Sequence, residues 1–260
     1  MDAASTADKA KSLEETPLSV SHGSVTVGDK TLAYTAKAGY LPIKDADGGI
    51  DALLFHTYYT LDGIDDPKDR PLLIAFNGGP GSSSVWLHLG TIGPKRIAML
   101  PDGSLPPPPY IIEDNPFTWL DVADIVFIDP VQTGFSHAKD EETAKKFLGV
   151  DGDLDCLSEF IRLFLTRNNR WASPLFMAGE SYGTTRGAGL AGLVAPARRA
   201  RWPGVRPAAD QRRRRGPVRA APPRRRAGAG RSGCPRPPAA RRARSAGTGP
   251  RSRRARRGRI

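Results

Sequence analysis

The motif Gly179-Glu-Ser-Tyr-Gly183 contains the serine best suited to covalent chemistry, Ser181. An apolar run over 175–178 precedes the motif, and the pattern after it predicts a helix over 184–194, ended by Pro196. On a sharp strand-to-helix turn, a serine hydroxyl stands clear of its neighbours at a helix N-terminus, which favours developing negative charge. The flanking glycines let neighbouring backbone approach without a Cβ clash. The pattern therefore predicts a nucleophile elbow with Ser181 as the attacking group.

A second glycine-rich loop, Asn77-Gly-Gly-Pro-Gly-Ser-Ser-Ser84, follows an apolar run over 72–76. A phosphate-binding loop would need a lysine directly after its glycines, and this loop has none. Glycines can instead aim backbone N–H groups at the oxyanion of a tetrahedral intermediate. We therefore interpret this segment as an oxyanion-hole loop that serves Ser181.

A serine nucleophile also needs a general base, most often a histidine oriented by a carboxylate. All four histidines of the chain precede the serine: His22, His56, His88 and His137. The only acidic residue after it is Asp210. His88 and His137 each follow a motif loop, but we expect both to be packing or surface histidines. The 260-residue chain is therefore predicted to lack its base and to be catalytically incomplete.

Strand and helix patterns alternate along the first 195 residues. The predicted strands are 20–27, 31–38, 52–61, 72–76, 125–128 and 175–178. The first two flank Gly28-Asp29, a dipeptide typical of hairpin turns with positive φ. The last three are continuously apolar, as in parallel strands that are covered on both faces. We expect an α/β fold whose incomplete, mostly parallel sheet carries an N-terminal β-hairpin, and whose exposed edge and face favour aggregation.

One longer helix is predicted over Asp153–Arg167, where apolar residues recur at helical spacing and would pack on the sheet. Either Asp151 or Asp153 is expected to cap its start, and Arg162, Arg167 and Arg170 suit its negative C-terminal end. The helix lies between two of the predicted parallel strands, so we expect a right-handed crossover.

Four motifs together carry a family resemblance. They are Asn77-Gly-Gly-Pro-Gly-Ser-Ser83, Asn115-Pro-Phe-Thr-Trp119, Ile128-Asp-Pro-Val-Gln-Thr-Gly-Phe-Ser136 and Gly179-Glu-Ser-Tyr-Gly183. Over residues 18–193 the chain resembles the serine carboxypeptidases, and Ser82 in the first motif resembles the bacterial members. The resemblance implies an α/β-hydrolase fold and removal of the C-terminal residue from peptides. One departure is Gln132, which stands where the family usually has glycine, so the backbone of that loop is expected to differ.

The resemblance also assigns the parts of the acyl-transfer machinery. Ser181 would be the nucleophile, and the backbone N–H groups of Gly79 and Tyr182 would form the oxyanion hole. An esterase or acyltransferase on the same fold would need the same three groups, and it is the alternative enzyme.

Recognition of the substrate's terminal carboxylate is assigned to Asn77, Gly78 and Glu180. An amide, a backbone N–H and a protonated glutamic acid can each donate a hydrogen bond to a carboxylate. Glu180 can donate only while it is protonated, which predicts tighter binding of the carboxylate at acidic pH. Asn77 and Glu180 therefore favour peptides with a free C-terminus as substrates.

Charge divides the chain near residue 195. The 260 residues have a formal net charge of +12, but 23 of the 39 Lys and Arg residues lie in 196–260, which contains no Lys. Arg, Ala, Pro and Gly dominate that segment, which cannot bury enough apolar surface to form a core. We expect a flexible N-terminus over 1–17, part of an α/β-hydrolase domain over 18–195 and a disordered tail over 196–260.

Three origins compete for the tail: an arm that binds nucleic acid, an inert solvated segment, or translation of a shifted reading frame. The third is favoured because these four amino acids have codons rich in G and C. A functional basic arm usually mixes Lys with Arg and includes aromatics, whereas Trp202 is the tail's single aromatic residue. Non-specific binding to polyanions is expected of any such polycation, and a non-catalytic nucleic-acid-binding protein is the alternative from another class.

Little else in the sequence points to a cofactor or a compartment. No metal or cofactor is expected, because no cluster of His, Cys and carboxylates has ligand spacing. No apolar run approaches the roughly 18 residues of a membrane span, and 1–15 has no signal-peptide core. Cys156 and Cys234 are interpreted as unrelated thiols. The family resemblance implies secretion or a periplasmic location, and the oligomeric state stays open.

Overall fold

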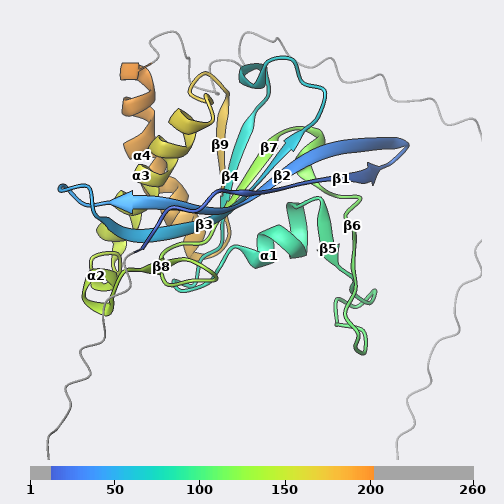
Figure 1. Cartoon of the computed structure of the whole chain (residues 1–260). Coiled ribbons are helices and arrows are strands. Elements are labelled where there is room, and N and C mark those ends of the chain that lie inside the picture. Colours follow the sequence, from blue (N-terminus) through green and yellow to red (C-terminus); the bar gives the residue numbers. More distant parts are fainter. Residues whose placement is uncertain (1–12, 202–260) are drawn as a thin grey trace, which may run out of the picture. The chain divides into compact units, whose positions relative to one another are not determined.

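A seven-stranded sheet forms the centre of the computed structural model, which describes residues 13–201 and side chains up to residue 196 (Figure 1). The strands are β1 (Ser19–Val27), β2 (Lys30–Lys44), β3 (Ile50–Leu61), β4 (Leu72–Phe76), β7 (Asp124–Ile128), β8 (His137–Ala138) and β9 (Leu175–Gly179). Their order is β1-β2-β3-β7-β4-β9, with β8 paired to β3. All six strands expected from the sequence are confirmed.

The sheet is mixed, so the expectation of a mostly parallel sheet is wrong. Pairing is antiparallel from β1 through β3 to β7 and between β3 and β8, and it is parallel only where β4 pairs with β7 and β9. The predicted hairpin is confirmed, since Val27 pairs with Lys30 around Gly28, whose φ is +62°. Short turns join β1, β2 and β3 and force antiparallel pairing, whereas parallel neighbours need longer crossovers.

Two buried clusters lie on the two faces of the sheet. Along β4, Leu72, Ile74 and Phe76 belong to one cluster, and Leu73 and Ala75 belong to the other. Because successive side chains of a strand point to opposite faces, this continuous apolar run supplies both clusters.

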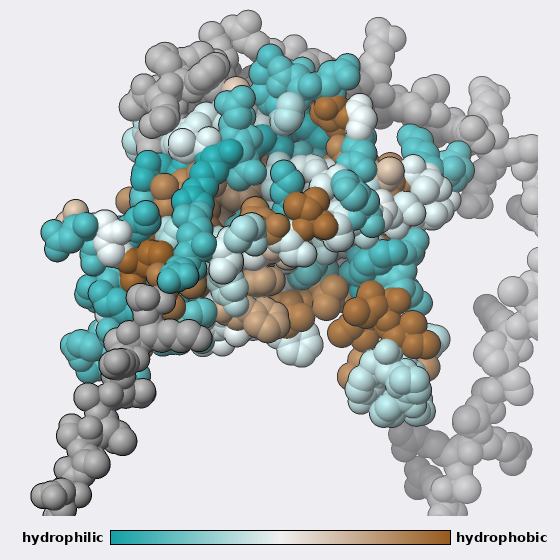
Figure 2. Space-filling view, in the orientation of Figure 1, coloured by the Kyte–Doolittle hydropathy of each residue, from teal (hydrophilic) through white to brown (hydrophobic). Residues whose placement is uncertain are grey.

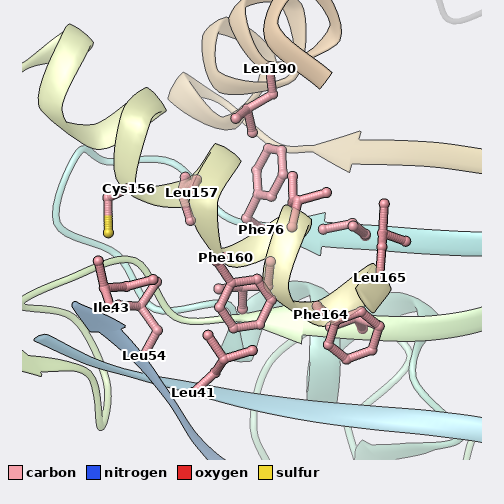
Figure 3. Close-up of a cluster of buried hydrophobic side chains, with 14 of the residues drawn as sticks. Leu41, Ile43, Leu54, Phe76, Cys156, Leu157, Phe160, Phe164, Leu165 and Leu190 are labelled. Atoms are coloured by element: carbon pink, nitrogen blue, oxygen red, sulfur yellow. The ribbon is translucent and has the colours of Figure 1, made fainter. Parts of the chain in front are cut away.

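Helices α3 (Val150–Arg167) and α4 (Tyr182–Arg201) cover the first cluster, where Phe160 of α3 and Leu190 of α4 pack with Phe76 of β4 (Figure 3). The second face is covered by short elements. The remaining elements are η1 (Pro67–Asp69), α1 (Val85–Leu87), η2 (His88–Ile92), β5 (Lys95–Ile97), β6 (Ile112–Asp114), η3 (Trp119–Asp121) and α2 (Glu141–Lys145).

The start of α3 differs from the expected cap. The helix begins at Val150, its N-cap is Gly149, and no side chain caps it, so the expectation of a cap by Asp151 or Asp153 is wrong. Because the helix begins three residues earlier than expected, both carboxylates lie inside its first turn. There they face the positive end of the helix dipole, and Asp153 is available to a partner outside the helix.

Helix α4 continues to Arg201 and contains Pro196, so the expected stop at this proline is wrong. Proline removes one backbone hydrogen bond, but the alanines on both sides of it and the arginines after it have high helix propensity. The flexible N-terminus was predicted for 1–17; within its described part, Glu15 pairs with Arg167 of α3. Of the predicted tail, only residues 196–201 are described, as the end of α4. The rest of the tail, including Cys234, lies outside the described residues.

A buried ionic network ties the connection before β9 to β7. Arg170 is 1% exposed and donates to Asp124 Oδ2 at 2.6 Å and to Tyr58 Oη at 2.7 Å. Arg70 donates from Nε to Asp124 Oδ1 at 2.7 Å. Arg170 was expected to serve the end of α3, but its guanidinium instead holds the base of the parallel strands together.

Strand β9 ends the strand order, and its outer edge is unpaired within residues 13–201. Cavities of about 610 and 710 Å³ flank it, and Phe176 is 38% exposed between them. Hydrophobic side chains also gather on the surface around β5 and β6, where Ile112 is 60% exposed (Figure 2). Among the described helices, none is both long and apolar enough to cross a membrane.

Candidate active site

Ser181 lies on the turn between β9 and α4, in the backbone conformation of a nucleophile elbow. Its φ is +54°, a left-handed value that is strained for a residue with a side chain. The flanking glycines are sterically required, since a Cβ on Gly183 would lie 2.7 Å from the carbonyl oxygen of Phe76. The hydroxyl is exposed, and no hydrogen bond to it is present in the described part of the chain.

The loop after β4 packs directly against this elbow. A Cβ on Gly78 would lie 2.4 Å from the backbone nitrogen of Tyr182, so only glycine allows the two loops to come this close. The next residue, Gly79, has a φ of +102°. Within residues 13–196, no hydrogen bond occupies the N–H of Gly79 or of Tyr182. Both donors are therefore free for a ligand beside Ser181.

Asn77 and Glu180 meet at the same place. Asn77 is 1% exposed, and its Oδ1 accepts a hydrogen bond of 3.0 Å from the backbone N–H of Leu87. This contact fixes the orientation of the amide, so Nδ2 donates to Glu180 Oε2 at 3.2 Å. The structure thus gathers all six residues singled out from the sequence around the turn after β9: Asn77, Gly78, Gly79, Glu180, Ser181 and Tyr182.

The loop after β7 forms a third wall. Gln132 has a φ of +62°, a left-handed value that glycine adopts without strain and that other residues rarely adopt. The loop and Tyr182 line a cavity of about 420 Å³, together with Pro80 of the loop after β4. Its walls are largely apolar and include Leu148. The cavity can take a small apolar side chain next to the elbow.

Two charged residues that the sequence analysis did not single out brace these loops. Asp129 accepts from the backbone N–H of Ser84 at 2.8 Å and of Phe135 at 3.3 Å, and burial raises its pKa. It therefore ties the loop after β4 to the loop after β7.

The second brace is Arg186 of α4, which is 3% exposed. It donates to Asp153 Oδ2 at 2.7 Å and to the carbonyl oxygens of Asn77 at 2.6 Å and Gly78 at 3.3 Å. Its position carried a signal in the sequence: a cation in the second turn of a helix opposes the helix dipole unless other groups hold it.

His88 and His137, the two histidines that follow motif loops, both interact with groups other than Ser181. The ring of His88 stacks on Phe127 at 4.5 Å, and its Nε2 lies 2.7 Å from Tyr59 Oη. Burial lowers the pKa of His88 to about 4. His137 has its Nδ1 3.1 Å from the carbonyl oxygen of Phe135. No hydrogen bond joins a histidine to Ser181 in the described part, which agrees with packing and surface roles for both.

No group of three or more His, Cys, Asp or Glu side chains in the described residues is arranged to hold a metal ion. Cys156, the only cysteine among the described residues, is a buried free thiol, and burial raises its pKa. The polar groups at the elbow are hydrogen-bond donors and one carboxylate, a set suited to an acyl group and an anion.

Comparison with known proteins agrees with this arrangement. The chain is 29% identical over 170 residues to serine carboxypeptidase-like 5 of Arabidopsis thaliana, covering 64% of this chain and 34% of that protein. It is 32% identical over 155 residues to the lysosomal protective protein of Mus musculus, covering 59% and 29%. The chain therefore spans about a third of the length of the curated relatives it matches.

Among solved structures, the prohormone-processing carboxypeptidase Kex1(delta)p of Saccharomyces cerevisiae matches with a TM-score of 0.49 and 23% identity, covering 66% of this chain and 35% of that chain. A family model described as serine carboxypeptidase matches residues 27–198. With the elbow at Ser181 and the glycine loop packed against it, the chain belongs to the serine carboxypeptidase family.

Proposed function

We propose that this site binds the C-terminal carboxylate of a peptide and presents the adjacent carbonyl to Ser181, as the acyl-transfer half of a serine carboxypeptidase. The observation that carries the proposal is the contact between Asn77 and Glu180 beside the elbow. An esterase has no need of this pair, whereas a free carboxylate needs donors of this kind.

Each group has a defined task in the proposed reaction. Ser181 Oγ attacks the carbonyl carbon, and the developing oxyanion accepts hydrogen bonds from the N–H groups of Gly79 and Tyr182. Breaking the C–N bond then leaves an acyl-serine and releases the C-terminal amino acid, whose nitrogen must receive a proton from an acid. The serine proton must likewise go to a base.

The terminal carboxylate accepts from the Asn77 amide, the Gly78 N–H and protonated Glu180. Asn77 is held for this task, because Leu87 N–H occupies its oxygen and leaves the amide N–H groups as donors. Ionised Glu180 would repel the ligand, so affinity is expected to rise as pH falls.

The 260 residues contain no histidine after Ser181, and the histidines before it are occupied elsewhere. Loss of the base in a comparable serine protease costs about 10⁶ in kcat. We therefore propose that these 260 residues bind the peptide carboxylate but turn the peptide over negligibly.

The test is calorimetric titration of the full chain with an N-acylated dipeptide, in the free-acid and the amidated form. We expect the free acid to bind and the amide to bind at least tenfold more weakly. Glu180→Gln supplies a donor at every pH, so it should remove most of the pH dependence that the unmutated chain shows. Equal binding of both peptides would overturn carboxylate recognition and favour an esterase or acyltransferase.

A further inference from the structure

Arg186 is a buried cation near the N-terminal end of α4, where the helix dipole disfavours positive charge. Its charge is balanced by Asp153 of α3, which lies 2.7 Å from Nε and whose side chain is 12% exposed. This ion pair uses only the Nε edge of the guanidinium. The other edge is directed at the loop after β4.

That second edge makes two hydrogen bonds to backbone carbonyls. Nη1 donates to Asn77 O at 2.6 Å and to Gly78 O at 3.3 Å. The carbonyl of Gly78 also accepts from the N–H of Ser82 at 3.2 Å. The Asn77 carbonyl has the shorter bond, which is charge-assisted and therefore stronger than a neutral one.

These bonds determine where the N–H groups of the loop point. The bonds from Asn77 to Gly78 and from Gly78 to Gly79 are both trans, so in each peptide plane the C=O and the N–H point in opposite directions. The guanidinium holds both carbonyls on its own side of the loop. The N–H groups of Gly78 and Gly79 are thereby directed away from Arg186.

The same guanidinium fixes the other side of the site. Its central carbon lies 4.9 Å from the centre of the Tyr182 ring, a cation–π contact that holds the residue after the nucleophile. Arg186 thus contacts the carbonyls of the two peptide planes that carry the Gly78 and Gly79 N–H groups, and it also contacts the side chain of Tyr182. These three residues supply every backbone N–H that the proposed function uses.

We propose that Arg186 is a positioning residue that orients the two peptide planes after Asn77, so that the Gly78 N–H faces the substrate carboxylate and the Gly79 N–H faces the oxyanion. This inference rests on the proposed function for the use of those N–H groups. Glycine has no Cβ to restrict its φ and ψ, so the planes on either side of Gly78 need an external partner to stay in one orientation.

The sequence offers a direct probe, because Asn77–Gly78 is the only Asn–Gly bond in the 260 residues. With carbonyl-¹³C asparagine and ¹⁵N glycine, a two-dimensional HNCO spectrum of the full chain contains one resonance, which reports this peptide plane. We expect one sharp resonance in the unmutated chain. In Arg186→Met the resonance should shift and either broaden or double.

Two control variants separate orientation from stability. Arg162→Met removes a surface pair of α3 with Glu159 and should leave the resonance unchanged. Asp153→Asn removes the ion pair but keeps both carbonyl bonds, so it should lower stability and retain one sharp resonance. If Arg186→Met does not fold, Arg186→Lys replaces it, because a single ammonium nitrogen lacks the separate Nε and Nη1 donors that reach Asp153 and the two carbonyls.

A single, unshifted resonance in every folded Arg186 variant would overturn the inference and leave Arg186 as an ion pair. As a second measurement, the dissociation constant of the free-acid peptide should rise about tenfold or more in Arg186→Met and stay unchanged in Arg162→Met. If the unmutated chain does not bind the peptide, the proposed function fails, while the resonance still decides whether Arg186 orients the loop.

Discussion

The side-chain amide of Asn77 donates a hydrogen bond of 3.2 Å to Glu180, which lies 103 residues further along the chain. The pair joins the loop after β4 to the residue directly before Ser181. Since Leu87 N–H occupies the amide oxygen, one N–H of Asn77 is used by Glu180 and the other is free for a ligand. The contact therefore places an amide donor and a carboxyl group at one end of the elbow.

Asn77→Asp should abolish this arrangement with little change of shape. The aspartate still accepts from Leu87 N–H, but it loses the donor and puts a second carboxylate beside Glu180. We expect the affinity for free-acid peptides at pH 7 to fall about 10- to 100-fold, the value of a hydrogen bond to a charged group. Calorimetric titration measures it.

Ser181→Ala is the control for this prediction, because it removes the proposed nucleophile and leaves the proposed carboxylate donors in place. Its affinity for the free-acid peptide should stay within about twofold. If Asn77→Asp weakened free-acid and amidated peptides equally, Asn77 would be a structural residue and not a carboxylate ligand.

Gly78→Ala should destabilise the fold where the loop after β4 meets the turn after β9. The new Cβ would lie 2.4 Å from Tyr182 N and 2.7 Å from Glu180 O, and both are backbone atoms that cannot move alone. Overpacking of this kind costs about 1–3 kcal/mol in the free energy of unfolding, measured with urea. Gly192→Ala in α4 meets open space, so it should stabilise the chain by up to about 1 kcal/mol. Similar effects of the two substitutions would contradict the close approach of the loops.

Local patterns predicted the elements and the elbow well, because both depend on neighbouring residues. The run over 72–76 became β4 with the expected bounds, and the motif around Ser181 gave the expected left-handed turn. Pairing partners are not local, so the antiparallel contact of β3 with β7 could not be derived from the strands alone.

The same limit applies to the arginines. Arg170 has the sequence position of a helix-end cation, yet its partner Asp124 lies 46 residues earlier in the chain. Arg186 has an unfavourable position in its helix, and only the fold shows that its guanidinium donates to the carbonyls of Asn77 and Gly78. Sequence periodicity identifies which residues are buried but not which charges meet.

Asp124→Asn should be among the most destabilising polar substitutions. Asp124 is 3% exposed, and it accepts from Arg70 at 2.7 Å and from Arg170 at 2.6 Å. Its loss leaves two buried guanidinium groups without a counter-ion, which costs about 3–5 kcal/mol in the free energy of unfolding. Glu159→Gln breaks an exposed pair on α3 and should cost less than about 1 kcal/mol. A small effect of Asp124→Asn in urea unfolding would show that the network contributes little.

Stability should fall in weak acid because of two histidines. Burial lowers the pKa of both His56 and His88 to about 4, and the positive charge of Arg167 adds to the effect at His56. An unfolded histidine binds its proton near pH 6.5, so between pH 6.5 and 4 the unfolded state holds more protons than the folded state. The contribution of these two neutral histidines to the free energy of unfolding is therefore complete above pH 6.5. It is lost as the pH falls toward 4, by up to about 3 kcal/mol per histidine.

Urea unfolding from pH 7 to pH 4.5 tests this prediction, with His56→Leu as the decisive variant. His56 packs edge-on against Phe160 and Phe164, so leucine is compatible with its surroundings. The variant should lose about half of the acid dependence, and the share of His88 should remain. An unchanged slope would show that His56 takes up its proton in the folded state.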